Sequence, residues 1–151
     1  MTKRSAGILM HRGRGKDLEV LLVHPGGPFW AKKDAGAWSI PKGEFDDEDP
    51  LVCAIREFEE ELGRRPDGEF ADLGEIRQAG GKVVRAFAVE GDFDAAGFVS
   101  DTFEMEWPPR SGKRQSFPEI DRAEWFGLEE ARMRINASQA DFLDRLARAS
   151  K

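Results

Sequence analysis

The chain has 151 residues, of which 40% are hydrophobic and 34% charged, and its formal net charge is −6. This length suits one domain with one core, and the longest apolar runs, such as Val20–Val23, are far too short to span a bilayer. The negative charge, without a broad basic face, argues against general nucleic-acid binding, so a small anionic ligand would need local cations or a bound metal to approach.

The first forty residues predict two strands followed by a loop. Only three apolar residues lie between the basic N-terminus and His11, so we expect no secretory signal. Residues 6–12 and 18–24 predict strands, and the second is almost continuously apolar, as is typical of a strand covered on both faces. Residues 25–35 are rich in Pro and Gly and predict a loop, after which residues 38–41 form a short extended piece.

Residues 50–62 predict a helix with well-defined ends. Asp49 suits the N-cap, Pro50 suits the first helical position, and Gly63 suits the C-terminal stop. Apolar residues recur at three- and four-residue steps and form one stripe, namely Leu51, Ala54, Ile55, Phe58 and Leu62. Cys53 lies beside this stripe and is expected to be a small buried residue. As the single cysteine it cannot form an internal disulfide, which fits a reducing cytoplasm.

The second half of the chain predicts more strands and closes with helices. Strands are expected at 70–78, 82–90, 102–107 and 124–126, with a polar, basic loop at 108–118. Helices are expected at 128–135 and 138–149. Strands interrupted by one central helix and followed by C-terminal helices predict an α/β sandwich on a mixed sheet, in a single domain spanning residues 1–151.

Nine carboxylates crowd into residues 43–63. Glu57, Glu60 and Glu61 follow one another at helical steps of three and four, so their side chains rise from neighbouring positions, away from the apolar stripe. Like charges at this spacing repel, whereas Mg²⁺ binds carboxylates together with waters and substrate phosphates. The pattern therefore fits either a solvated acidic surface or a metal site to which Glu48, just before the helix, also contributes.

The acidic segment resembles the signature of the Nudix hydrolases. That signature reads Gly, five residues, Glu, seven residues, Arg-Glu, an apolar residue, any residue, Glu-Glu, any residue and Gly. From Glu48 through Arg56 to Gly63 every fixed position matches, and residues 41–43, Pro-Lys-Gly, resemble the opening of many members. A Trp-Phe pair at 125–126 is also similar to a segment that closes many family members.

One spacing departs from the family pattern. Four residues, rather than five, separate Gly43 from Glu48. We place the deletion in this loop because the distance from Glu48 to Arg56 is the expected one. Asp46 and Asp47 then remain alternatives to Glu48 at the outer metal position.

The resemblance implies a Nudix-type α/β/α sandwich with a central mixed β-sheet, and a pyrophosphohydrolase that uses Mg²⁺ or Mn²⁺. By resemblance, the metal ligands are Gly43, Glu48, Glu57, Glu60 and Glu61, and Arg56 orients the glutamates by ion pairing. The implied reaction is attack of a metal-activated water on one phosphorus of a nucleoside diphosphate linked to another group. The proton acceptor is Glu57 or a glutamate of a distal loop, for which we expect Glu119, with Asp121 and Glu124 as alternatives.

Cations and aromatic residues outside the signature are candidates for substrate binding. Outer phosphates are expected to contact the cations Lys42, Arg110, Lys113 and Arg114. Phe29 and Trp30 are candidates to stack a base. Trp38 is expected in the core, and His11 and His24 are interpreted as structural.

The compact layout is most similar to the diadenosine-polyphosphate branch of the family, so a dinucleoside polyphosphate is the expected substrate. ADP-ribose, oxidised nucleoside triphosphates and capped RNA ends remain alternatives, as does a non-catalytic, nucleotide-binding Nudix module with a regulatory role. The expected partner is a small nucleotide, without a membrane or nucleic acid. The chain is expected to be a cytoplasmic monomer or homodimer.

Overall fold

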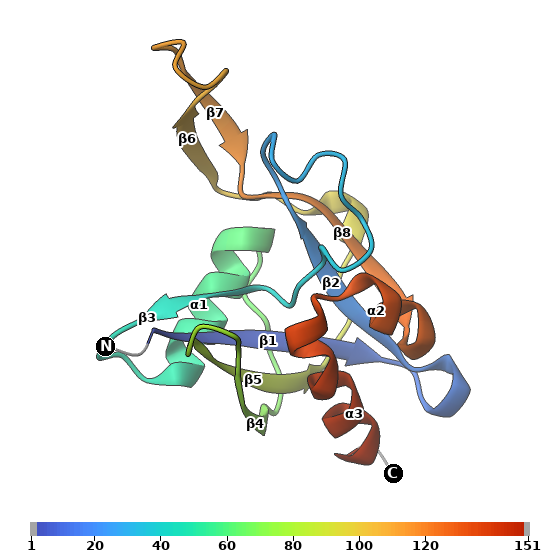
Figure 1. The fold of residues 1–151 in the computed structure, drawn as a ribbon. Helices are drawn as coiled ribbons and strands as arrows, with labels where there is room; N and C mark the ends of the chain where they lie inside the picture. The colour runs from blue at the N-terminus through green and yellow to red at the C-terminus, as the bar shows by residue number, and fades with distance from the viewer. Residues whose placement is uncertain (1–2, 150–151) are drawn as a thin grey trace.

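The computed structural model describes residues 3–149, and a mixed six-stranded sheet forms its centre (Figure 1). The strands of this sheet are β1 (Arg4–Arg12), β2 (Glu19–Pro25), β3 (Lys42–Phe45), β4 (Ala71–Arg77), β5 (Val83–Glu90) and β8 (Ile120–Gly127). Their order is β4-β5-β1-β2-β8, and only β1 and β5 run parallel. β2 and β3 share one side of β1, since β3 pairs with its first half and β2 with its end. The predicted mixed sheet is confirmed.

Helices cover the two faces of this sheet. Helix α1 (Pro50–Leu62) packs on one face, and α2 (Leu128–Arg134) and α3 (Ala140–Ala149) pack on the other. Alternation along β1 explains the two layers, because Ile8 joins the core under α1 with Phe58 while Leu9 joins the opposite core with Phe142. The predicted α/β/α sandwich is therefore confirmed. No helix among residues 3–149 has the length and apolar character needed to cross a membrane.

A second, two-stranded sheet projects from the body as a hairpin (Figure 1). It consists of β6 (Thr102–Glu106) and β7 (Arg114–Pro118), with Phe103 opposite Phe117 in register. The predicted loop at 108–118 is therefore wrong over its second half. The polar residues of β7 show no alternation that could have predicted a strand, because β7 pairs only with β6 and stays largely exposed.

The remaining differences from the predicted elements are small. The sequence did not predict β3, which follows the extended piece at 38–41. Strand β8 begins four residues before the strand expected at 124–126, since its pairing with β2 extends from Gly127 back to Ile120. A short 3₁₀ turn, Ala137–Gln139, precedes α3, so the last helix starts two residues later than expected.

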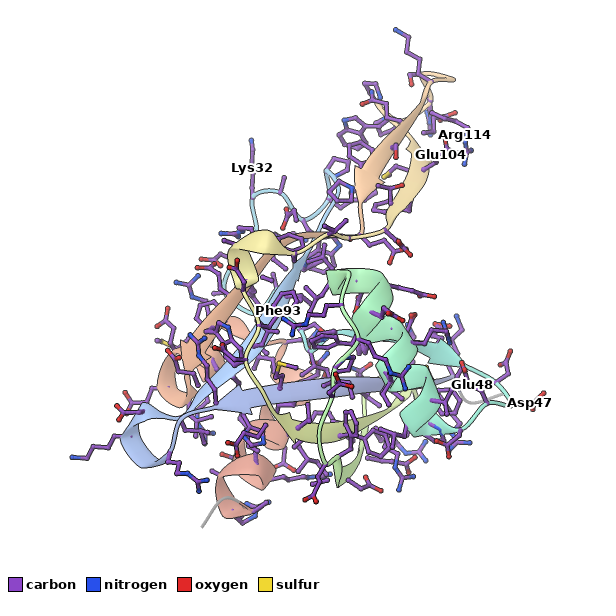
Figure 2. The ribbon with its side chains drawn as sticks, turned by 180° about the vertical axis from the view of Figure 1, so that it is seen from behind. Lys32, Asp47, Glu48, Phe93, Glu104 and Arg114 are labelled. Carbon is purple, nitrogen blue, oxygen red and sulfur yellow. The ribbon has the colours of Figure 1, made fainter. Side chains whose placement is uncertain are left out.

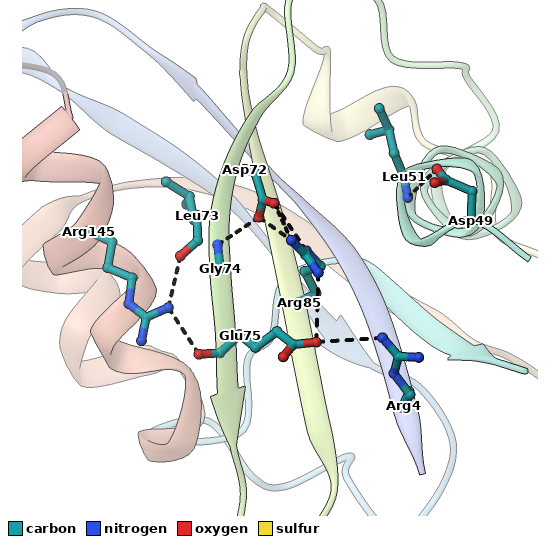
Figure 3. A network of polar contacts seen from close by, with 9 residues as sticks. All are labelled: Arg4, Asp49, Leu51, Asp72, Leu73, Gly74, Glu75, Arg85 and Arg145. Atoms are coloured by element: carbon teal, nitrogen blue, oxygen red, sulfur yellow. Dashed lines mark hydrogen bonds and ion pairs between the residues drawn. The ribbon is translucent and has the colours of Figure 1, made fainter. Parts of the chain in front are cut away.

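Arg145 of α3 protects the edge of the main sheet (Figure 3). Its Nη1 donates hydrogen bonds to the carbonyl oxygens of Leu73, at 2.8 Å, and Glu75, at 3.1 Å. Both acceptors belong to β4, the edge strand, whose free backbone groups could otherwise pair with another chain. These bonds also hold α3 against the sheet.

Candidate active site

Helix α1 carries the acidic cluster, and its ends are defined as the sequence predicts. The Asp49 carboxylate accepts hydrogen bonds from the N–H groups of Leu51, at 3.0 Å, and Val52, at 3.2 Å. Gly63 ends the helix in the left-handed region with φ +81°. The buried side chains of the helix are Cys53, Ala54, Phe58 and Leu62. These buried side chains fix the rotation of the helix about its axis, so the glutamates on its other face point in one direction.

Arg56 lies close to three carboxylates on one side of the acidic cluster. Its guanidinium pairs with Glu48 and lies 3.4 Å from Oε1 of Glu60 and 3.7 Å from Oε2 of Glu57. Beside these partners, the pKa of Arg56 is raised above its usual range. The loop glutamate Glu48 therefore reaches the cluster although the loop before it is one residue short.

The glutamates themselves repel one another in the absence of a bound cation. Burial raises the pKa of Glu57 to about 7, and the neighbouring Glu60 adds to the effect. Burial also raises the pKa of Glu61 well above its usual range, with contributions from Glu57 and Glu119. Glu119, from a segment 58 residues after Glu61, has a pKa raised by burial, Asp101 and Glu60. The structure therefore brings Glu119 beside the helix glutamates.

One oxygen of the cluster lacks any partner. Oε2 of Glu61 is buried and accepts no hydrogen bond. A buried carboxylate oxygen without a hydrogen-bond partner destabilises the fold unless it binds a proton or a cation. Among residues 3–149 no three carboxylate, imidazole or thiol groups already converge into a closed metal site. The oxygen-only donor set and the unpaired Glu61 oxygen nevertheless fit a hard divalent cation.

Gly43 lies against the helix at the same place. A Cβ atom at this position would overlap the side chain of Glu57, so only glycine lets β3 approach the cluster. Its carbonyl oxygen accepts a weak hydrogen bond from Sγ of Cys53 at 3.5 Å. The expected ligand Gly43 is therefore beside Glu57, and Cys53 is buried as predicted.

A pocket of about 590 Å³ opens next to Glu61 and Glu119. Its other polar and charged lining residues are Ser39, Lys42, Gln78, Lys82, Asn136 and Gln139. Its apolar lining includes Val23, Ile40, Trp30 and Phe103. The pocket thus combines carboxylates, cations and aromatic rings, which is the chemistry needed for a metal-bound nucleotide.

Two lysines line this pocket, and sequence reasoning identified only one of them. Lys42 is largely buried; burial lowers its pKa, and Lys82 lowers it further, while Glu61 opposes the shift. Lys82 follows two glycines in the turn between β4 and β5. A lysine in a turn carries no sequence signal for a site, and the structure places it in the lining of the same pocket as Lys42.

The other expected phosphate-binding cations lie elsewhere. Arg110, Lys113 and Arg114 are exposed residues of the hairpin, and none of them lines the pocket. Figure 2 shows Arg114 on the projecting hairpin, far from Glu48 at the start of α1. That they bind outer phosphates stays a prediction.

The aromatic candidates separate into a core and a surface group. Trp38 is fully buried, as predicted, and His24, which was interpreted as structural, is fully buried as well. Trp30 and Phe103 line the pocket, while the exposed Phe29 packs edge-on against Trp107 with ring centroids 5.6 Å apart. Loop and hairpin together thus place aromatic rings at the mouth of the pocket.

Comparison with known proteins agrees with this fold. A family model described as the NUDIX domain matches residues 1–146, and the chain therefore belongs to the NUDIX hydrolase family. NUDIX hydrolases generally use divalent metal ions. A search of curated proteins found no match.

Similar solved structures extend over almost the whole chain. The NUDIX domain of Shewanella oneidensis NrtR, solved with ADP ribose, has a TM-score of 0.67 at 15% identity and covers 100% of this chain and 90% of its own. A binary complex of the C. elegans Ap4A hydrolase has a TM-score of 0.64 at 20% identity, with 96% of each chain covered. A MutT protein from Methanosarcina mazei Go1 has a TM-score of 0.61 at 22% identity, and the match covers 99% of this chain and 96% of the MutT chain. Identities this low establish the fold alone.

Proposed function

We propose that this protein hydrolyses the pyrophosphate linkage of a nucleoside diphosphate joined to another group, with Mg²⁺ or Mn²⁺ as cofactor. The observation that carries the proposal is the meeting of Glu57, Glu60, Glu61 and Glu119 beside a pocket that contains Lys42 and Lys82. Acidic and basic groups are thereby placed around one substrate-sized space.

Within this proposal, each group has a separate task. Glu57, Glu60 and Glu61 would hold the metal, with Glu48 and the Gly43 carbonyl beside them. When bound, the metal supplies a water of lowered pKa and neutralises charge on the pyrophosphate oxygens. Glu119 accepts the proton of the attacking water, with Glu57 as the alternative acceptor, since a general base works best with a pKa near the operating pH.

The pocket supports a dinucleoside polyphosphate as the substrate. Lys42 and Lys82 can contact phosphates that the metal does not cover. Trp30 and Phe103 offer faces on which a base can stack, worth about 1–3 kcal/mol per base. The Ap4A hydrolase with the same fold agrees with this choice. ADP-ribose is the second candidate, because the NrtR domain of the same fold was solved with it.

A Mg²⁺-dependent phosphate-release assay over a nucleotide panel tests the proposal. The panel holds diadenosine tetraphosphate, ADP-ribose and oxidised and ordinary nucleoside triphosphates, with Glu60→Gln as the control variant. We expect the highest kcat/KM for the dinucleoside polyphosphate and a loss of at least about 100-fold in Glu60→Gln. Nucleotide binding without turnover of any substrate would favour the non-catalytic module, and an unchanged rate in Glu60→Gln would contradict the metal site.

Two matched variants locate the phosphate-binding cations. Lys82→Ala removes a pocket lysine, and Arg114→Ala removes a hairpin cation of the same charge. We expect Lys82→Ala to raise KM about tenfold for a tetraphosphate, because a lost charge-assisted contact costs about 1.5–3 kcal/mol. An equal rise in KM for Arg114→Ala would show that the hairpin cations bind phosphate as well. A rise in KM for Arg114→Ala alone would assign phosphate binding to the hairpin.

A further inference from the structure

The backbone at Glu119 is held by segments that are distant in the sequence. The N–H of Glu119 donates to the carbonyl of Asp101 at 2.8 Å, and its own carbonyl accepts from the N–H of Gly26 at 2.8 Å. The next N–H, that of Ile120, donates to Oγ of Ser100 at 3.0 Å. Both N–H groups and the carbonyl around the proposed base are thus paired.

The Ser100 hydroxyl completes a closed ring of hydrogen bonds with the backbone of Asp101, Glu119 and Ile120. Its proton is donated to the Asp101 carbonyl at 2.8 Å, which leaves its lone pairs for the N–H of Ile120. The same Asp101 carbonyl accepts the N–H of Glu119. One hydroxyl therefore connects the two consecutive peptide groups that set the direction of the Glu119 side chain.

The same segment also binds the end of the glutamate helix. The N–H of Asp101 donates to the carbonyl of Glu60 at 3.0 Å, and the N–H of Val99 donates to the carbonyl of Leu62 at 3.2 Å. The last carbonyls of a helix have no partner within the helix, so residues 99–101 satisfy two of them. Residues 99–101 thereby join α1 directly to the segment that carries Glu119.

We propose that Ser100 is a positioning residue, which holds Glu119 at a set distance from the glutamates of α1. The proposal rests on the proposed role of Glu119 as proton acceptor. A displacement of about 1 Å from productive geometry can lower a rate about 100-fold. The Ser100 hydroxyl is the only side-chain group among the described residues that hydrogen-bonds the backbone of residues 119–120.

Three variants separate positioning from general stability. Ser100→Ala removes the hydroxyl, Ser100→Thr retains it, and Ser116→Ala removes an exposed serine of the hairpin as the matched control. We expect Ser100→Ala to lower kcat about tenfold with KM unchanged. We expect Ser100→Thr and Ser116→Ala to stay within about twofold of the parent chain. A wild-type kcat in Ser100→Ala, or equal losses in kcat for Ser100→Ala and Ser100→Thr, would overturn the proposal.

A second measurement needs neither metal nor substrate. Hydrogen–deuterium exchange of the metal-free protein reports the opening of the N–H groups at 119 and 120. In Ser100→Ala we expect exchange at these two positions to be at least about fivefold faster, while residues 50–62 of α1 keep their protection. Unchanged exchange at 119 and 120 would overturn the proposal.

Two further variants separate this inference from the proposed function. If Glu60→Gln retains full activity, the metal-dependent function itself fails. If Glu60→Gln is inactive but Glu119→Gln equals the parent chain, the function stands and the role of Ser100 is overturned. If Ser100 acts through Glu119, the double variant Ser100→Ala/Glu119→Gln is no slower than Glu119→Gln alone, whereas multiplied losses would overturn the proposal.

Discussion

The guanidinium of Arg56 binds the carboxylate of Glu48, although the loop that carries Glu48 is one residue shorter than the family pattern. This ion pair connects α1 to the loop before it. Because Arg56 also lies near Glu57 and Glu60, it draws all three carboxylates to one edge of the site. The ion pair therefore joins Glu48 to the cluster although the loop is shorter.

Replacing Arg56 with alanine should weaken Mg²⁺ binding about 10- to 100-fold, because outer-shell groups that orient metal ligands contribute this much. The Mg²⁺ concentration for half-maximal rate measures the change. Arg56→Lys should be intermediate, since lysine keeps the charge but loses the planar fork. The exposed Arg148→Ala is the control, and an unchanged Mg²⁺ dependence in Arg56→Ala would contradict the orienting role.

Replacing Gly43 with alanine should lower kcat at least about tenfold. The added Cβ would overlap the Glu57 side chain, so either Glu57 or β3 must move. Gly127→Ala is a matched control, because a Cβ there meets no atom within 4 Å and the backbone needs no positive φ. Steady-state kinetics of the two variants should differ clearly, and equal rates would show that the close approach of Gly43 is not needed for activity.

The stability of the metal-free protein should fall as the pH rises from about 4.5 to about 7. Glu57 has an ordinary pKa of 4.5 and a folded-state pKa of about 7, because burial and Glu60 disfavour its charged form. As the pH rises, the Glu57 carboxyl group loses its proton at a lower pH in the unfolded chain than in the folded chain. The stabilisation that is present below pH 4.5 is therefore lost as the pH rises to about 7.

Thermal melts in EDTA at pH 5 and pH 8 measure this effect. The drop in Tm between the two pH values should be smaller in Glu57→Gln than in the parent chain. Added Mg²⁺ should raise Tm more at pH 8, where the carboxylates are charged and able to bind it. An equal pH dependence in Glu57→Gln would assign the effect to other groups.

Replacing Asp49 with alanine should destabilise the fold by about 1 kcal/mol, because the N–H groups of Leu51 and Val52 lose their shared acceptor. This corresponds to a decrease of about 2–4 °C in Tm for a domain of this size. Asp49→Asn should keep most of the stability, since asparagine is an equally good N-cap. Asp46→Ala, an exposed neighbour, serves as the control in metal-free melts.

The thiol of Cys53 should be unreactive in the folded protein. It is fully buried, and burial, with Glu48 adding to it, raises its pKa to about 11. At pH 8 the reactive thiolate is therefore scarce and inaccessible. A colorimetric thiol reagent should react only after denaturant unfolds the chain, and rapid reaction without denaturant would contradict this burial.

Features that depend on neighbours in the chain could be predicted from the sequence. The bounds of α1 follow from Asp49, Pro50 and Gly63, since capping and helix termination are local effects. The relation of Glu57 to Glu60 and Glu61 follows from helical periodicity. β2 was recognisable as a central strand because its apolar run needs cover on both faces.

Sequence periodicity could not describe the surroundings of these glutamates. The three residues were expected to point away from the core, yet the Glu61 carboxylate is buried and one of its oxygens is unpaired. The backbone of Lys42, which belongs to β3, hydrogen-bonds this carboxylate. Burial, and hence the raised pKa of Glu61, depends on this packing.

The sequence by itself therefore determined the sandwich class, the helix and its row of glutamates, because local propensity and periodicity encode them. Tertiary structure alone decided which distant groups complete the site. Residues 99–101 connect Glu119 to α1, and Lys82 lies near Lys42. The cations Arg110, Lys113 and Arg114 lie on the hairpin of β6 and β7. The contacts that place Glu119 and Lys82 join segments that are distant in the sequence, and no local pattern records such contacts.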